Sequence, residues 1–138
     1  MIIADSSFWI ALANSRDTHH LRAKTVYESL NEGLVTTWPV MAETCHLLVK
    51  RLGVHAQLNF IKAWINGAFE LFDLPPEADQ EIFSLMKKYV DLPMDLADAS
   101  LIILAESLGH GRILSSDRRD FKTYRWKTRK PFENLLLE

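Results

Sequence analysis

The chain has 138 residues, of which 48% are hydrophobic and 25% are charged, as in one average globular domain spanning residues 1–138. These proportions exclude a disordered tail, a collagen-like repeat and a membrane bundle, and the apolar runs are too short to cross a bilayer. The formal net charge of -2 indicates neither a nucleic-acid-binding protein nor an acidic tail.

Strands and helices are predicted to alternate along the chain. We predict strands at residues 1–4, 34–37, 69–74 and 112–115, and helices at residues 8–13, 19–30, 40–52, 55–66, 78–89 and 96–108. This alternation is typical of a three-layer α/β/α sandwich around a central, mostly parallel sheet of four or five strands. Ligands of such sheets bind beyond the carboxyl ends of the strands.

Acidic residues follow the predicted strands at this edge. Asp5 closes the first strand, Asp117 closes the fourth, Glu43 lies about one turn into the helix after the second, and Asp95 and Asp98 occupy the first turn of a later helix. Each acid alone is compatible with a structural role, as an N-cap, a capping-box partner or a complement to a helix dipole. Several acids near one edge are harder to explain in this way.

A metal ion is the simplest way to hold these acids together. Two carboxylates about 5 Å apart repel by about 3 kcal/mol at an effective dielectric constant near 20. A divalent cation offsets this repulsion, and oxygen ligands favour Mg²⁺, or alternatively Mn²⁺, over zinc. Such an ion polarises a phosphoryl oxygen and activates water, which are the requirements of phosphodiester hydrolysis.

Four segments, in order along the chain, resemble the PIN-domain ribonucleases, and especially the VapC-type toxins of toxin–antitoxin pairs. They are residues 3–7 (IADSS), 40–43 (VMAE), 96–102 (LADASLI) and 114–121 (LSSDRRDF). The resemblance implies a PIN-like α/β/α fold and a magnesium-dependent endoribonuclease that cleaves single-stranded regions of RNA. It also implies an antitoxin partner and a homodimer.

The same resemblance implies which residues form the site. The catalytic acids would be Asp5, Glu43, Asp98 and Asp117. All but Glu43 are expected to be metal ligands, and Glu43 is either a ligand or the base that orients the attacking water. The hydroxyl of Ser116, which precedes the last acid, is expected to support the site.

Three neighbouring residues are additional candidates in this scheme. Asp95 and Asp120 are further candidate metal ligands, with helix or turn capping as the alternative. Ser6 is expected to support the site beside Asp5.

The carboxyl-terminal segment is basic. From Arg112 to Lys130 there are eight basic residues and two acids, so this segment carries +6 and the remainder -8. The candidate RNA-binding residues are Arg112, Arg118, Arg119 and Lys122. A solvated surface and an antitoxin contact are the alternatives. Tyr124 and Trp126 are placed either to stack on bases or, in the case of Trp126, to join Phe132 in anchoring a last strand in the core.

Other kinds of site find no support. The chain has no P-loop or dinucleotide fingerprint, so no nucleotide cofactor is expected, and its five histidines lack metal-binding spacing. Cys45 is the sole cysteine and residues 1–5 lack the character of a signal peptide, so we expect a cytoplasmic protein without intramolecular disulfides.

Two other functions remain open at this point. A receiver-like signalling domain also binds magnesium in an acidic pocket, but it needs paired acids after the first strand and a phospho-acceptor after the third. Here the first strand is followed by Asp5 alone, and Asp73 is the acid near the end of the third. A PIN-like module that only binds RNA or protein would leave the four acids unexplained.

Overall fold

A central parallel sheet organises the computed structural model, which describes residues 1–137. Its strand order is β3-β2-β1-β4-β7 and all four pairings are parallel. The strands of this sheet are β1 (Ile2–Ala4), β2 (Leu34–Thr37), β3 (Glu70–Phe72), β4 (Arg112–Leu114) and β7 (Glu133–Asn134). Two further strands, β5 (Arg125–Trp126) and β6 (Lys130–Pro131), form a short antiparallel hairpin.

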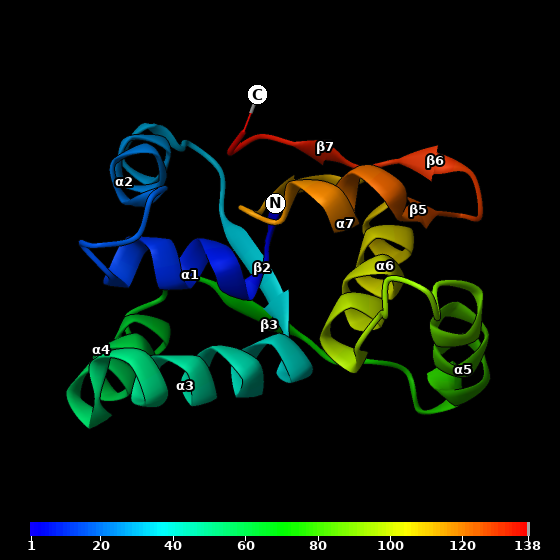
Figure 1. Ribbon diagram of the computed structural model, residues 1–138, viewed down its shortest axis with the longest axis horizontal. Coiled ribbons are helices and arrows are strands. Elements are labelled where there is room, and N and C mark those ends of the chain that lie inside the picture. Colours follow the sequence, from blue (N-terminus) through cyan, green and yellow to red (C-terminus); the bar gives the residue numbers. More distant parts are fainter. Residues whose placement is uncertain (138) are drawn as a thin grey trace.

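Helices cover both faces of the sheet (Figure 1). They are α1 (Ser6–Ala13), α2 (His20–Ser29), α3 (Trp38–Leu52), α4 (Val54–Ile65), α5 (Asp79–Lys88), α6 (Leu96–Leu108) and α7 (Arg118–Thr123), with a 3₁₀ turn, η1 (Pro76–Ala78), before α5. In Figure 1, α1 to α4 lie on the left, and α5 and α6 on the right.

The two cores follow from the alternation of side chains along each strand. Ile2 and Ala4 pack in one cluster with residues of α1, α3 and α4, whereas Ile3, between them, packs in the other cluster with residues of α6. Both faces of β1 are therefore buried, as in a parallel sheet covered on two sides. The predicted three-layer α/β/α sandwich with a parallel sheet of four or five strands is confirmed.

Several elements differ from the sequence-based prediction. The third strand is limited to Glu70–Phe72 rather than residues 69–74, and β5, β6, α7 and β7 are additional elements. The helix α7 has six residues, of which Phe121 alone is buried, so it shows no apolar periodicity. The side chains of Trp126 and Phe132 are buried in the core, which favours the anchoring alternative for Trp126 over base stacking.

The strand order also distinguishes this fold from that of receiver domains. Receiver domains have the order 2-1-3-4-5, in which the first and third strands are neighbours. Here β1 lies between β2 and β4, and β3 is the edge strand. Asp73, which follows β3, accepts a hydrogen bond from the indole N–H of Trp38 at 2.9 Å. The receiver-like alternative is therefore wrong.

Within residues 1–137, the structure has no helix that meets the length and hydropathy needed to span a membrane.

Candidate functional site

The strand order changes direction between β1 and β4, and this point positions the site. The chain builds outward from β1 to β2 and β3 on one side, and then adds β4 and β7 on the other. In open parallel sheets the crevice at such a switch point lies beyond the carboxyl ends of the two strands. The residue after β1 is Asp5, and its backbone N–H donates to the carbonyl of Leu114 at the end of β4 (3.1 Å).

Two serine hydroxyls hold the Asp5 carboxylate. Its Oδ2 accepts hydrogen bonds from Ser7 Oγ (2.7 Å) and Ser115 Oγ (2.9 Å). Asp5 is 5% exposed, and burial raises the pKa of its carboxyl above the usual value despite these bonds. Although Asp5 occupies the N-cap position of α1, its side chain makes no capping bond. The N-cap explanation does not account for this buried acid.

The supporting hydroxyls differ in part from those expected. Ser116 contributes its backbone N–H, which donates to Ser7 Oγ (2.9 Å), and Ser115 Oγ accepts from the backbone N–H of Asp117 (2.9 Å). The hydroxyls that contact Asp5 thus belong to Ser7 and Ser115, which the sequence analysis did not single out. The hydroxyl of Ser6 donates to Glu43 Oε1, so Ser6 contacts Glu43 rather than Asp5.

Glu43 reaches the site from α3. Pro39 stands at the start of this helix, and Thr37 caps it by accepting from the backbone N–H of Val40. Glu43 therefore lies about one turn in, beside the ends of β1 and β2. Burial raises its pKa to about 7, with further contributions from the charges of Asp95 and Asp5.

Asp98 lies in the first turn of α6, and a buried tyrosine holds it. The O–H of Tyr124 donates to Asp98 Oδ2 at 2.8 Å. Burial raises the pKa of Asp98 to about 8, with repulsion from Asp95 and Asp5 adding to the effect. Asp95 caps α6 by accepting from the backbone N–H of Asp98 (2.8 Å) and remains exposed. Its position fits the capping alternative, and its charge adds to the field at Asp98.

Asp117 and Asp120 form the start of α7. Asp117 Oδ1 caps this helix by accepting from the backbone N–H of Asp120 (3.1 Å). Burial raises the pKa of Asp117 to about 6, with hydrogen-bonding and charge effects of Asp120 adding to it. Asp120 in turn is 3.3 Å from the guanidinium of Arg119.

These acids bring several carboxyl groups, whose oxygens are potential metal ligands, to one edge of the sheet. Four predicted site acids, from the ends of β1 and β4 and the starts of α3 and α6, all have raised pKa values, and three of them are raised in part by the charge of Asp5. Within residues 1–137, no three acidic, histidine or cysteine side chains converge closely enough to coordinate one ion in their present rotamers. Carboxylate oxygens are the ligand type that Mg²⁺ and Mn²⁺ prefer, so the metal site stays a prediction that rests on the chemistry of these acids.

The expected RNA-binding residues lie in different places. Arg112 stands at the amino end of β4, where its guanidinium pairs with both carboxylate oxygens of Glu32 and lowers the pKa of that acid to about 2. The acids lie at the opposite, carboxyl end of β4, so Arg112 is not part of the candidate RNA surface. Arg118, Arg119 and Lys122 lie exposed on α7, next to Asp117.

Tyr124 is the residue whose role the sequence analysis missed. The side chain is fully buried, packs edge-on against Tyr89 and Phe121, and contacts Asp98, so it is not available to stack on a base. Its place among basic residues suggested an exposed ring. The only local signal for burial was the pattern of aromatic residues between 121 and 132.

Comparisons with known proteins agree with this geometry. The PIN domain family model matches residues 2–127. Ribonuclease VapC26 of Mycobacterium tuberculosis H37Rv is 29% identical over 124 residues, which cover 90% of this chain and 92% of that protein. The 23S rRNA-specific endonuclease VapC20 of strain CDC 1551 is 24% identical over 109 residues, covering 79% and 83%.

A solved structure shows the same fold. The crystal structure of M. tuberculosis VapC20, described as a sarcin-ricin loop cleaving toxin, matches with a TM-score of 0.78 at 21% identity. The match covers 86% of this chain and 91% of that one.

Proposed function

Because the chain belongs to the PIN domain family, we propose that it is a metal-dependent endoribonuclease that cleaves single-stranded regions of RNA. The observation that carries this proposal is the group of buried and half-buried acids Asp5, Glu43, Asp98 and Asp117 at the switch point between β1 and β4. The relatives VapC26 and VapC20 are a ribonuclease and an rRNA-specific endonuclease by name, which supports the same activity.

The acids have distinct tasks in this proposal. Asp5, Asp98 and Asp117 would hold Mg²⁺ or Mn²⁺, with Asp95 and Asp120 as further candidate ligands. When bound, the ion supplies charge stabilisation at a phosphoryl oxygen and lowers the pKa of a water molecule. Glu43 has a pKa of about 7, so near neutral pH it is suited to orient the attacking water and accept its proton.

The hydroxyls act by positioning these acids. Ser7 and Ser115 fix the carboxylate of Asp5 between β1 and β4, and Ser6 fixes that of Glu43. Tyr124, which packs in the same core cluster as α6, fixes Asp98. These hydrogen bonds would keep the acids at one edge of the sheet before substrate arrives.

The biological setting follows from the same relatives. We infer that the chain is the toxin of a type II toxin–antitoxin pair in the cytoplasm, and that it forms a homodimer. Leu58 and Ile65 of α4 are 54% and 75% exposed, which is the kind of apolar surface that a protein partner covers. A small DNA-binding protein encoded by the adjacent reading frame would support the antitoxin proposal.

The test is cleavage of single-stranded RNA by purified Asp5→Asn protein with and without a chelator. Asparagine keeps the shape of the buried side chain but removes its charge, so we expect cleavage to be lost while the fold is retained. Wild-type cleavage should also stop when the metal is chelated. Undiminished cleavage by the variant, after contaminating nucleases are excluded, would sink the assignment, and a wild-type protein that binds RNA without cleaving it would indicate a non-catalytic PIN-like module.

A further inference from the structure

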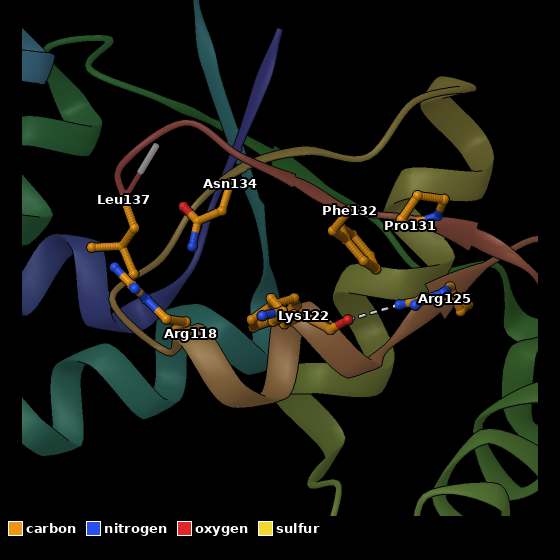
Figure 2. Close-up of a pocket in the computed structure, with 8 residues that line it drawn as sticks. Arg118, Lys122, Arg125, Pro131, Phe132, Asn134 and Leu137 are labelled. Atoms are coloured by element: carbon orange, nitrogen blue, oxygen red, sulfur yellow. Dashed lines mark hydrogen bonds between the residues drawn. The ribbon is translucent and has the colours of Figure 1, made fainter.

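A basic pocket of about 360 Å³ lies between α7 and the carboxyl-terminal segment, beside the acids. Figure 2 shows Arg118, Lys122 and Arg125 on the side of α7, with Asn134 across from them on the strand that contains β7. Arg118 and Lys122 are four residues apart and so share one face of the helix. Phe121 and Phe132, whose rings are 5.4 Å apart, supply an apolar floor.

The cations of this pocket lack a counter-charge in the described part of the chain. No acidic side chain lines the pocket there, and neither Arg118 nor Lys122 forms an ion pair. Arg125 is different, because its guanidinium donates to the carbonyls of Lys122, Thr123 and Tyr124 at the end of α7. Its orientation is therefore fixed, whereas the other two cations are free to meet an anion.

A hydrogen-bonded residue connects this pocket to the acids. Asn134, which lines the pocket, donates from its amide to the carbonyl of Ser115 (2.8 Å) and accepts from the N–H of Ser115 (3.3 Å). The hydroxyl of Ser115 donates to Asp5. Ser115, at the end of β4, thus links a residue of the pocket to a residue of the candidate site, so the two lie on neighbouring parts of the fold.

We propose that this pocket is a phosphate-binding subsite for a nucleotide flanking the cleavage point of the RNA. The inference rests on the proposed function. A pocket of this volume suits one small ligand group, and within residues 1–137 its cations Arg118 and Lys122 form no ion pair. Arg118 directly follows Asp117, so a cation of the pocket stands next to a proposed catalytic acid, which matches a phosphate of the substrate RNA better than the carboxylate of an acidic protein segment.

The test measures RNA affinity without cleavage. A short fluorescein-labelled oligouridine is titrated with full-length protein in chelator, over salt concentrations from about 0.05 to 0.5 M. The variants are Arg118→Ala, Lys122→Ala and their combination, because substituting Arg125 would also release three backbone carbonyls. The matched control is Lys24→Ala combined with Lys62→Ala, which removes the same charge from exposed positions on α2 and α4.

Each lost phosphate contact reduces the slope of log affinity against log salt by about 0.7 for a single strand. If wild-type and variant proteins bind equally at 1 M salt, the slope change weakens binding at 0.1 M by roughly fivefold for each single variant. For the double variant, the affinity at 0.1 M falls by about 25-fold. The control should keep the wild-type slope. Equal slopes in the double variant and the control would overturn the subsite.

A second arm separates RNA from a protein ligand. If the pocket variants bind RNA normally but lose affinity for a labelled oligoglutamate peptide, the pocket belongs to an acidic partner and the proposal is wrong. Asp5→Asn protein distinguishes this failure from failure of the proposed function. Retained cleavage by that variant would refute the nuclease site, whereas unchanged binding by the pocket variants would refute the subsite alone.

Discussion

Replacing Asp98 with Asn in metal-free protein should raise thermal stability, although the residue lies in the proposed catalytic site. In the folded chain its pKa is about 8, against 3.8 in the unfolded chain, so at pH 7 folding must take up a proton. Asparagine needs no proton and still offers an oxygen to the O–H of Tyr124. The variant therefore removes the free-energy cost of proton uptake on folding and keeps the hydrogen bond from Tyr124.

The size of the stability gain follows from the difference between the folded and unfolded pKa values of Asp98. Each pH unit above 3.8 costs about 1.4 kcal/mol until the folded-state pKa is reached, which gives about 4 kcal/mol at pH 7 as an upper limit. Entry of water and rotation of side chains reduce the gain to about 1 to 3 kcal/mol. For a domain of this size, that gain raises the Tm by roughly 3 to 10 °C.

The contribution of Asp98 to folding stability should change with pH in one direction. A carboxyl whose pKa is raised on folding binds more protons in the folded state, so its contribution to stability falls as the pH rises from about 4 to about 8. The advantage of Asp98→Asn should accordingly be near zero at pH 4 and largest near pH 8. In excess magnesium the ionised aspartate becomes a useful ligand, and the advantage should shrink or reverse.

The assay is thermal unfolding followed by circular dichroism in chelator and in magnesium, at several pH values. Glu28→Gln, an exposed acid on α2, is the matched control and should melt like wild type under each condition. The reasoning is refuted if Asp98→Asn melts at or below the wild-type temperature in chelator at pH 7 to 8. That result would mean that burial and the charges of Asp95 and Asp5 do not destabilise the ionised carboxyl of Asp98.

Two further predictions concern neighbouring residues. Tyr124→Phe removes the hydrogen bond to Asp98 and should lower kcat by about 10- to 100-fold with little change in KM, whereas Tyr89→Phe, which loses a bond to a backbone N–H, should leave both unchanged. In Gly111→Ala, the new Cβ would lie 2.5 Å from the indole nitrogen of Trp126, so urea unfolding should show a loss of about 1 to 3 kcal/mol, and wild-type stability would contradict that packing.

The arrangement of acids could be predicted because each one follows a strong local signal. Asp5 ends an apolar run and Glu43 follows Pro39 by four residues, so the strand and helix boundaries around them were readable. Parallel pairing then brings the strand ends together, whatever the details of packing. The four site acids accordingly lie along one edge of the sheet.

Other features depend on contacts that local sequence does not encode. The strand β7 has two residues and is defined by pairing with β4, including the bond from Glu133 N–H to the carbonyl of Gly111. The placement of Arg112 depends on Glu32, which is distant in sequence. The choice of Ser115 rather than Ser116 as the hydroxyl beside Asp5 depends on strand register, since adjacent residues point to opposite sides.

The pairing of β1 with β4 has a consequence for the timing of activity during synthesis. These neighbours are more than a hundred residues apart in the chain, and Ser115, Asp117 and Tyr124 all follow β4. A nascent chain therefore lacks the hydroxyls of Ser115 and Tyr124 and the last acid of the site until its carboxyl-terminal part has left the ribosome. Assembly of the proposed catalytic groups then coincides with completion of the sheet, so we expect a growing chain to stay inactive until its carboxyl-terminal part has folded.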